Sequence, residues 1–100
     1  MADQKKLTLP TLHLNGSSVH DLNERIMDAH AGVEEALVRL AAASPNARDY
    51  YPQGLGAWEK AVQEHDARME KLREVARELL QVFEGIDEQG NVIEAQKRSR

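Results

Sequence analysis

An unbroken repeat of apolar positions in the second half of the chain limits what this sequence can form. These positions alternate steps of four and three residues over about four heptads, the 3.5-residue spacing of a helix whose seam packs on another helix. The repeat predicts a helix over residues 57–86. A turn over 87–93 and a flexible basic tail over 94–100 are expected to follow. The seam positions are Trp58, Val62, His65, Met69, Leu72, Ala76, Leu79, Phe83 and Ile86.

A second amphipathic helix is predicted over residues 18–43. Ser18 suits the N-cap position and Asp21 the first turn, where a negative charge is favourable. Pro45 ends the helix, because the residue before a proline avoids the α conformation. The expected inner face again steps by three and four residues: Val19, Leu22, Ile26, Ala29, Val33, Ala36 or Leu37, and Leu40.

The predicted fold is therefore all-α, a coiled-coil-like hairpin of two long antiparallel helices joined by the loop 44–56. Hydrophobic residues make up 41% of the chain but aromatic residues only 4%, so Ala, Leu and Val dominate and favour helix packing. Residues 1–6 are expected to be disordered. Residues 7–15 should form an extended arm, since Pro10 interrupts their alternating pattern.

Both helices carry apolar stripes wider than one partner helix needs. Small chains with this surplus often oligomerise, so a homo-oligomer, most simply a dimer, is expected to complete a helical bundle.

Composition argues against several classes of protein. The chain has no cysteine, so it has no disulfide framework and no thiolate zinc site. No window is apolar enough for a membrane span, and the N-terminus does not read as a signal peptide, which predicts a cytoplasmic protein without a membrane partner. The net charge is -4, which argues against a broad nucleic-acid face. We interpret the terminal Lys97, Arg98 and Arg100 as a solvated end.

The most unusual segment is the run Asn46-Ala47-Arg48-Asp49-Tyr50-Tyr51-Pro52-Gln53-Gly54 in the loop. Tyrosine rings can stack, the guanidinium can hold an anion, and amide side chains can read polar edges. The segment is thus a candidate site for a small anionic or nucleotide-like ligand, formed by Asn46, Arg48, Asp49, Tyr50, Tyr51 and Gln53. The structural alternative is that the tyrosines cap the hairpin and Arg48 pairs with Asp49.

A second polar cluster leads into the first helix and contains His13 and Asn15. Helix N-terminal amides suit an anion, and in an antiparallel dimer this cluster would meet the loop of the other subunit. His65 lies in the seam, with Arg68 close by, and is either a ligand-binding group or, as we favour, a polar residue that fixes register.

Catalytic and metal chemistry have little support in the sequence. The histidines His13, His20, His30 and His65 include no pair spaced by four residues, the spacing of a zinc-binding helix. Nothing distinguishes one carboxylate pair as an acid and base. We expect no metal, no cofactor and no enzymatic activity.

The chain resembles a group of short uncharacterised proteins of bacteriophage and prophage genomes. The resemblance spans roughly residues 7–86 and lies in the segment Leu9-Pro10-Thr11-Leu12-His13-Leu14-Asn15-Gly16-Ser17, the loop Pro45 to Gly54, and Glu64-His65 with Arg68. It implies an accessory phage protein acting in the host cytoplasm and no specific activity.

Three functions remain open at the level of sequence. The first is a homo-oligomer that sequesters a small anionic ligand at the 46–54 loop. The second is a protein–protein interaction module that engages a host or virion protein. The third is a DNA-associated helper that works through its basic tail and would bind less tightly as salt increases.

Overall fold

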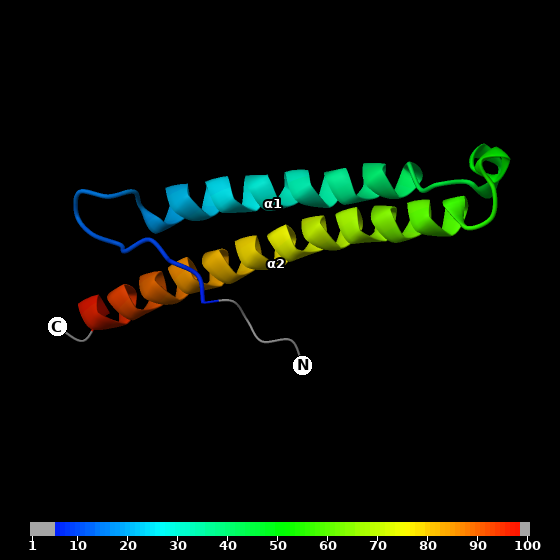
Figure 1. Ribbon diagram of the computed structural model, residues 1–100. Helices are drawn as coiled ribbons and strands as arrows, with labels where there is room; N and C mark the ends of the chain where they lie inside the picture. Colours follow the sequence, from blue (N-terminus) through cyan, green and yellow to red (C-terminus); the bar gives the residue numbers. More distant parts are fainter. Residues whose placement is uncertain (1–5, 99–100) are drawn as a thin grey trace.

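Two long antiparallel helices lie side by side and form a hairpin (Figure 1). The computed structural model describes residues 6–98. Helix α1 spans Val19–Ala42 and helix α2 spans Ala57–Arg98. Two short 3₁₀ turns, η1 (Ala47–Asp49) and η2 (Tyr51–Gln53), lie between them. The all-α hairpin is confirmed, and residues 6–98 contain no strand.

Helix α1 begins and ends where its capping residues predict. The Oγ of Ser18 accepts a hydrogen bond of 3.1 Å from the backbone N–H of Asp21, and Ser18 itself has extended backbone angles. The expected inner face was partly wrong, because Ala29 is exposed. The seam passes instead through the half-buried Asn23 and His30, which complete a 3.5-residue repeat with their apolar neighbours.

Helix α2 does not stop near residue 86. The expected turn over residues 87–93 is wrong, because these residues are helical, and the expected flexible tail is helical as far as Arg98. Residues 99–100 of that tail and residues 1–5 of the expected disordered start lie outside the described residues. The turn was expected because Gly90 follows a polar run. Gly90 instead packs against the start of α1, where a Cβ would lie 3.0 Å from Cγ2 of Val19. Ile93 then continues the seam, half-buried.

The N-terminal arm lies along the last turns of α2, as Figure 1 shows. The side-chain amide of Gln89 holds its backbone at two points: Nε2 donates to the carbonyl of Pro10 at 2.8 Å, and Oε1 accepts from the N–H of Leu12 at 3.2 Å. Leu9 packs on Gly85, where a Cβ would overlap its Cδ1. Ile86, between these two contact points, is completely buried.

The hairpin is a rod of 72 × 26 × 19 Å. Its radius of gyration is 20.1 Å, whereas a compact domain of this length has about 13 Å. Over residues 6–98 neither helix is long and apolar enough to cross a membrane. Among these described residues only His65, Met69, Ala76 and Ile86 are buried. A two-layer hairpin therefore buries few side chains completely and leaves most of its seam residues half-buried.

Candidate functional site

The predicted ligand-binding loop forms the tip of the hairpin. The side chain of Asn46 caps η1 by accepting a hydrogen bond of 3.1 Å from the N–H of Arg48. Gly54 and Gly56 have φ values of 105° and 88°, a region in which side chains with a Cβ are strained. These two glycines turn the chain back into α2. The tip is thus two tight turns between rigid helix ends.

The structure brings together all the tip residues that the sequence singled out. Asn46, Arg48, Asp49 and Gln53 are exposed, and Tyr50 is half-buried. The side chain of Tyr51 is 76% exposed, and that of Leu55, which follows η2 in the same tip, is 107% exposed. The tip therefore presents an aromatic and an aliphatic side chain outward, next to charged groups.

His13 and Asn15 lie far from the tip of the same chain. They belong to the segment before α1, at the opposite end of the hairpin (Figure 1). The 24 residues of α1 separate the two ends, and a helix of that length spans about 36 Å at 1.5 Å per residue. Within one chain the two halves of the predicted site cannot contact one ligand. Only a second subunit would bring them together.

His65 joins the loop to the seam. It is 6% exposed, and its Nε2 lies 3.2 Å from Oγ of Ser44. The hydroxyl of Ser44 donates to the carbonyl of Ala41 at 2.7 Å, so its oxygen is left to accept from Nε2–H of His65. Arg68, the other polar residue singled out here, is exposed. This geometry matches the structural interpretation of His65.

Trp58 ties the tip to α2 at its first turn. Its indole Nε1 donates a hydrogen bond of 3.1 Å to the carbonyl of Pro45. Part of the ring remains in solvent, at 38% exposed. The indole therefore anchors the base of the tip and still offers apolar surface beside it.

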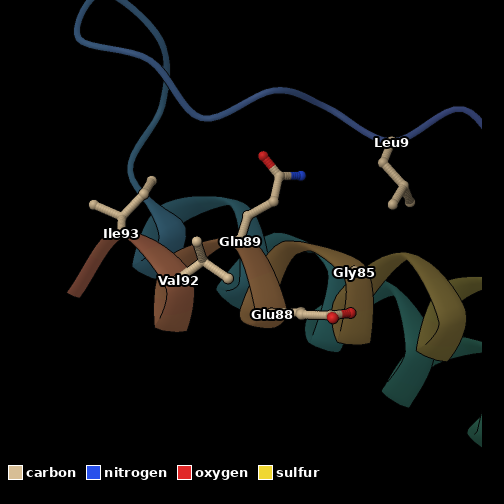
Figure 2. A pocket seen from close by; sticks show the side chains of 6 residues that line it. All are labelled: Leu9, Gly85, Glu88, Gln89, Val92 and Ile93. Atoms are coloured by element: carbon tan, nitrogen blue, oxygen red, sulfur yellow. The ribbon is translucent and has the colours of Figure 1, made fainter. Parts of the chain in front are cut away.

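A cavity of about 440 Å³ lies at the other end of the molecule, between the arm and α2. Figure 2 shows Leu9 reaching toward Gly85 from the arm, with Gln89 reaching back toward the arm. The residues that line this cavity are Leu9, Gly85, Glu88, Gln89, Val92 and Ile93. The sequence did not predict this cavity, because residues 87–93 were expected to form a turn instead of continuing α2. The apolar spacing of Gly90 and Ile93 beyond Ile86 was the available signal.

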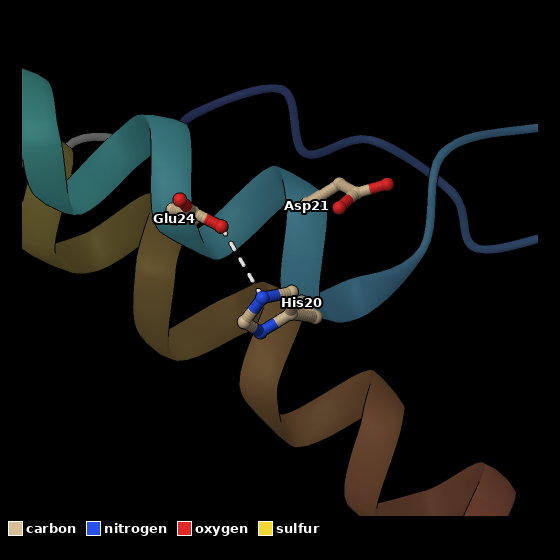
Figure 3. Close-up of side chains that lie close together, drawn as sticks. All are labelled: His20, Asp21 and Glu24. Atoms are coloured by element: carbon tan, nitrogen blue, oxygen red, sulfur yellow. Dashed lines mark ion pairs between the residues drawn. The ribbon is translucent and has the colours of Figure 1, made fainter.

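His20, Asp21 and Glu24 gather on the first turns of α1 (Figure 3). Nε2 of His20 lies 3.2 Å from Oε2 of Glu24, and the nearest ligand atoms of the three residues lie within 4.8 Å of one another. All three are exposed. The positive end of the helix dipole favours the carboxylates there and opposes a bound cation. The cluster is explained as a favourable helix start.

A charge network crosses the exposed side of α2. Glu70 Oε1 accepts a hydrogen bond of 2.7 Å from Arg77, and Arg73 lies 3.5 Å from its other oxygen. The hydrogen bond and positive charge of Arg77 lower the pKa of Glu70 below its ordinary value, and Arg73 adds to the effect. The network stabilises the ionised carboxylate on the helix surface.

Comparison of the chain with protein-family models, with curated proteins and with solved structures found no match. Its function must therefore be argued from this geometry.

Proposed function

We propose that the chain is a non-enzymatic protein-interaction module that acts as a homo-oligomer and presents its tip to a partner protein. The resemblance to phage-type sequences would make it an accessory protein, with a host or virion protein as partner.

The exposure of both Leu55 and Tyr51 on the tip carries this proposal. At 107% and 76% exposed, these side chains offer apolar surface that the described residues 6–98 leave uncovered. Exposed apolar groups with a polar rim are typical of protein-binding patches, and tyrosine is enriched at such contacts. Arg48 and Asp49, both exposed on η1, supply that rim.

The form of the tip favours a protein over a small ligand. Small-molecule sites are concave and bury most of the ligand, whereas Figure 1 shows the tip as a knob at the end of a rod. The cavity of about 440 Å³ is at the opposite end and is lined by no tip residue. Sequestration of an anion by Arg48 with a stacking tyrosine stays a prediction.

The exposed area supports a homo-oligomer. The chain exposes 7966 Å². A compact monomeric protein of 11.2 kDa exposes about 5,700 Å². The surplus, roughly 2,300 Å², exceeds the 800 Å² or so that each partner buries in a standard interface.

Affinity capture from the source cells, with tip variants and a matched control, tests the proposal. Leu55→Asp combined with Tyr51→Ser should abolish recovery of a stoichiometric protein partner, because both apolar contacts are lost. Val38→Asp, at a residue that is 72% exposed on α1, should leave recovery unchanged. Native mass spectrometry of the same samples separates the alternatives. A retained small molecule that Arg48→Ala removes would favour ligand binding and overturn the proposal.

A further inference from the structure

One side of the hairpin is lined mainly by small and apolar residues from both helices, and one charged residue, Arg68, lies among them between Ala61 and Val75. Each lies one position before a seam residue: Ala36 before Leu37, for example, and Val75 before Ala76. In an antiparallel pair, these positions of the two helices fall on the same side of the seam. We name this surface the alanine face, and it comprises Leu22, Ala29, Ala36, Ala61, Val75 and Val82.

We propose that a second copy of the chain packs on the alanine face and completes a four-helix bundle. The inference rests on the proposed homo-oligomer and specifies which surface it uses. Val75 is 44% exposed and Ala29 is exposed, while the other members of the face are half-buried. Small side chains let two helix pairs approach closely, so that the valines of each copy can interdigitate.

The opposite side of the hairpin is much less suitable. There the flanking positions hold Met27 and Leu80, each 37% exposed, and the small Ala41. The next flanking positions along the helices are charged, Glu34 on α1 and Arg73 on α2. Packing a second copy on this side would bury charges on both helices, whereas the alanine face has one charge, Arg68, whose stem can pack on apolar surface while its head stays in water. Burying the charges costs more than the apolar contact returns. A second copy that covers the surplus exposed area is therefore expected to pack on the alanine face.

Gly32 gives an independent reason for the same choice. Glycine destabilises a helix interior relative to alanine. At the two other helical glycines, close packing offsets this loss: Gly85 packs against Leu9 and Gly90 against Val19. At Gly32 a Cβ would meet no atom of the described residues within 4 Å apart from its chain neighbours and the nearby backbone of its own helix. Gly32 lies three residues after Ala29 and four before Ala36, at the edge of the alanine face. A second copy packed closely there would explain a glycine at this position.

The arm sets one limit of the interface. It occupies α2 beside Gly85 and Gln89, so the free part of the face extends from Val82 and Ala29 toward the tip. The second copy would cover this part and leave Tyr51 and Leu55 free for a different partner.

Sedimentation of the full chain and two matched variants tests the inference. Val75→Glu places a carboxylate on the alanine face and should raise the dimer dissociation constant by about 100-fold or more, because an unpaired charge would be buried. Val38→Glu makes the same change on the other side of α1, at a residue that is 72% exposed, and should leave the dimer intact. Circular dichroism of each variant monitors its helix content.

Cross-linking keeps the test decisive if Val75→Glu unfolds. The chain has no cysteine, so Ala36→Cys and Val38→Cys each introduce a single thiol. A short bismaleimide should join two copies of Ala36→Cys and not of Val38→Cys. A dimer that survives Val75→Glu, or that cross-links only through Val38→Cys, would overturn this face while leaving the homo-oligomer in place. A wild-type monomer at high concentration would overturn both.

Discussion

Replacing Gly85 with alanine sets two effects of opposite sign against each other. Alanine stabilises a helix interior by about 0.5–1 kcal/mol relative to glycine. The added Cβ would overlap Leu9 Cδ1 and displace that side chain from α2. The side chain of Leu9 is 38% exposed, so more than half of its surface is buried. Burying a whole leucine side chain contributes about 1.5–3 kcal/mol, so displacing Leu9 into solvent costs roughly 1–2 kcal/mol. The packing loss should therefore match or exceed the helix gain.

A double-mutant cycle separates these two effects. In the wild-type background, Gly85→Ala should leave the free energy of unfolding unchanged or lower it by up to about 1.5 kcal/mol. In a Leu9→Ala background the clash is gone, and the same substitution should stabilise by about 0.5–1 kcal/mol. The expected coupling is thus roughly 1–2 kcal/mol. Denaturant unfolding of all four proteins at one protein concentration measures it. Equal stabilisation in both backgrounds would show that Leu9 does not pack on Gly85 in solution.

Two further substitutions test contacts on α2. Gln89→Ala removes both hydrogen bonds to the arm and should lower the free energy of unfolding by about 1–3 kcal/mol, at roughly 0.5–1.5 kcal/mol for each bond. The backbone amide of Leu12 should then exchange its hydrogen faster while the helix amides stay protected. Unchanged exchange at Leu12 would contradict the contact. Arg77→Ala should raise the pKa of Glu70 toward its ordinary value, as followed by NMR titration, because the cationic hydrogen-bond donor is lost. Since the folded-state pKa of Glu70 is lowered, the stabilisation from this pair is present above the ordinary carboxyl pKa and is lost as the pH falls through the lowered value. A pKa of Glu70 that does not respond to Arg77→Ala would show that the pair is not populated in solution.

The sequence predicted the helices better than their limits. The repeat in α2 identified a seam from Val62 to Ile86 that the structure confirms, because 3.5-residue periodicity directly reflects packing on another helix. The sequence did not predict that α2 continues past Gly90, because a glycine after a polar run is typical of a turn. The chain uses this glycine for close contact with Val19. Composition alone does not distinguish these two uses.

The predicted inner face of α1 was partly wrong for a related reason. An apolar pattern selects Leu22 and Ala29, whereas the seam contains Asn23 and His30. Polar residues in a seam are invisible to a hydrophobicity argument unless their partner helix is known. The tip residues were found because their composition departs from the repeat, but the exposure of Leu55 depends on how the two turns place it.

The polar seam residues connect the register of the hairpin to its proposed interface. His65 meets Ser44 at the tip end, and Gly90 meets Val19 at the arm end. A shift of one heptad along α2 would separate both pairs and leave the His65 imidazole buried without its partner, at a cost of about 1–3 kcal/mol. Contacts at both ends thus hold one alignment, as polar seam residues do in coiled coils. Ala36 of α1 and Val75 of α2 would share a side after such a shift as well. The alignment instead determines which residues of the two helices lie next to each other on the alanine face, and therefore the shape of the surface that a second copy can use.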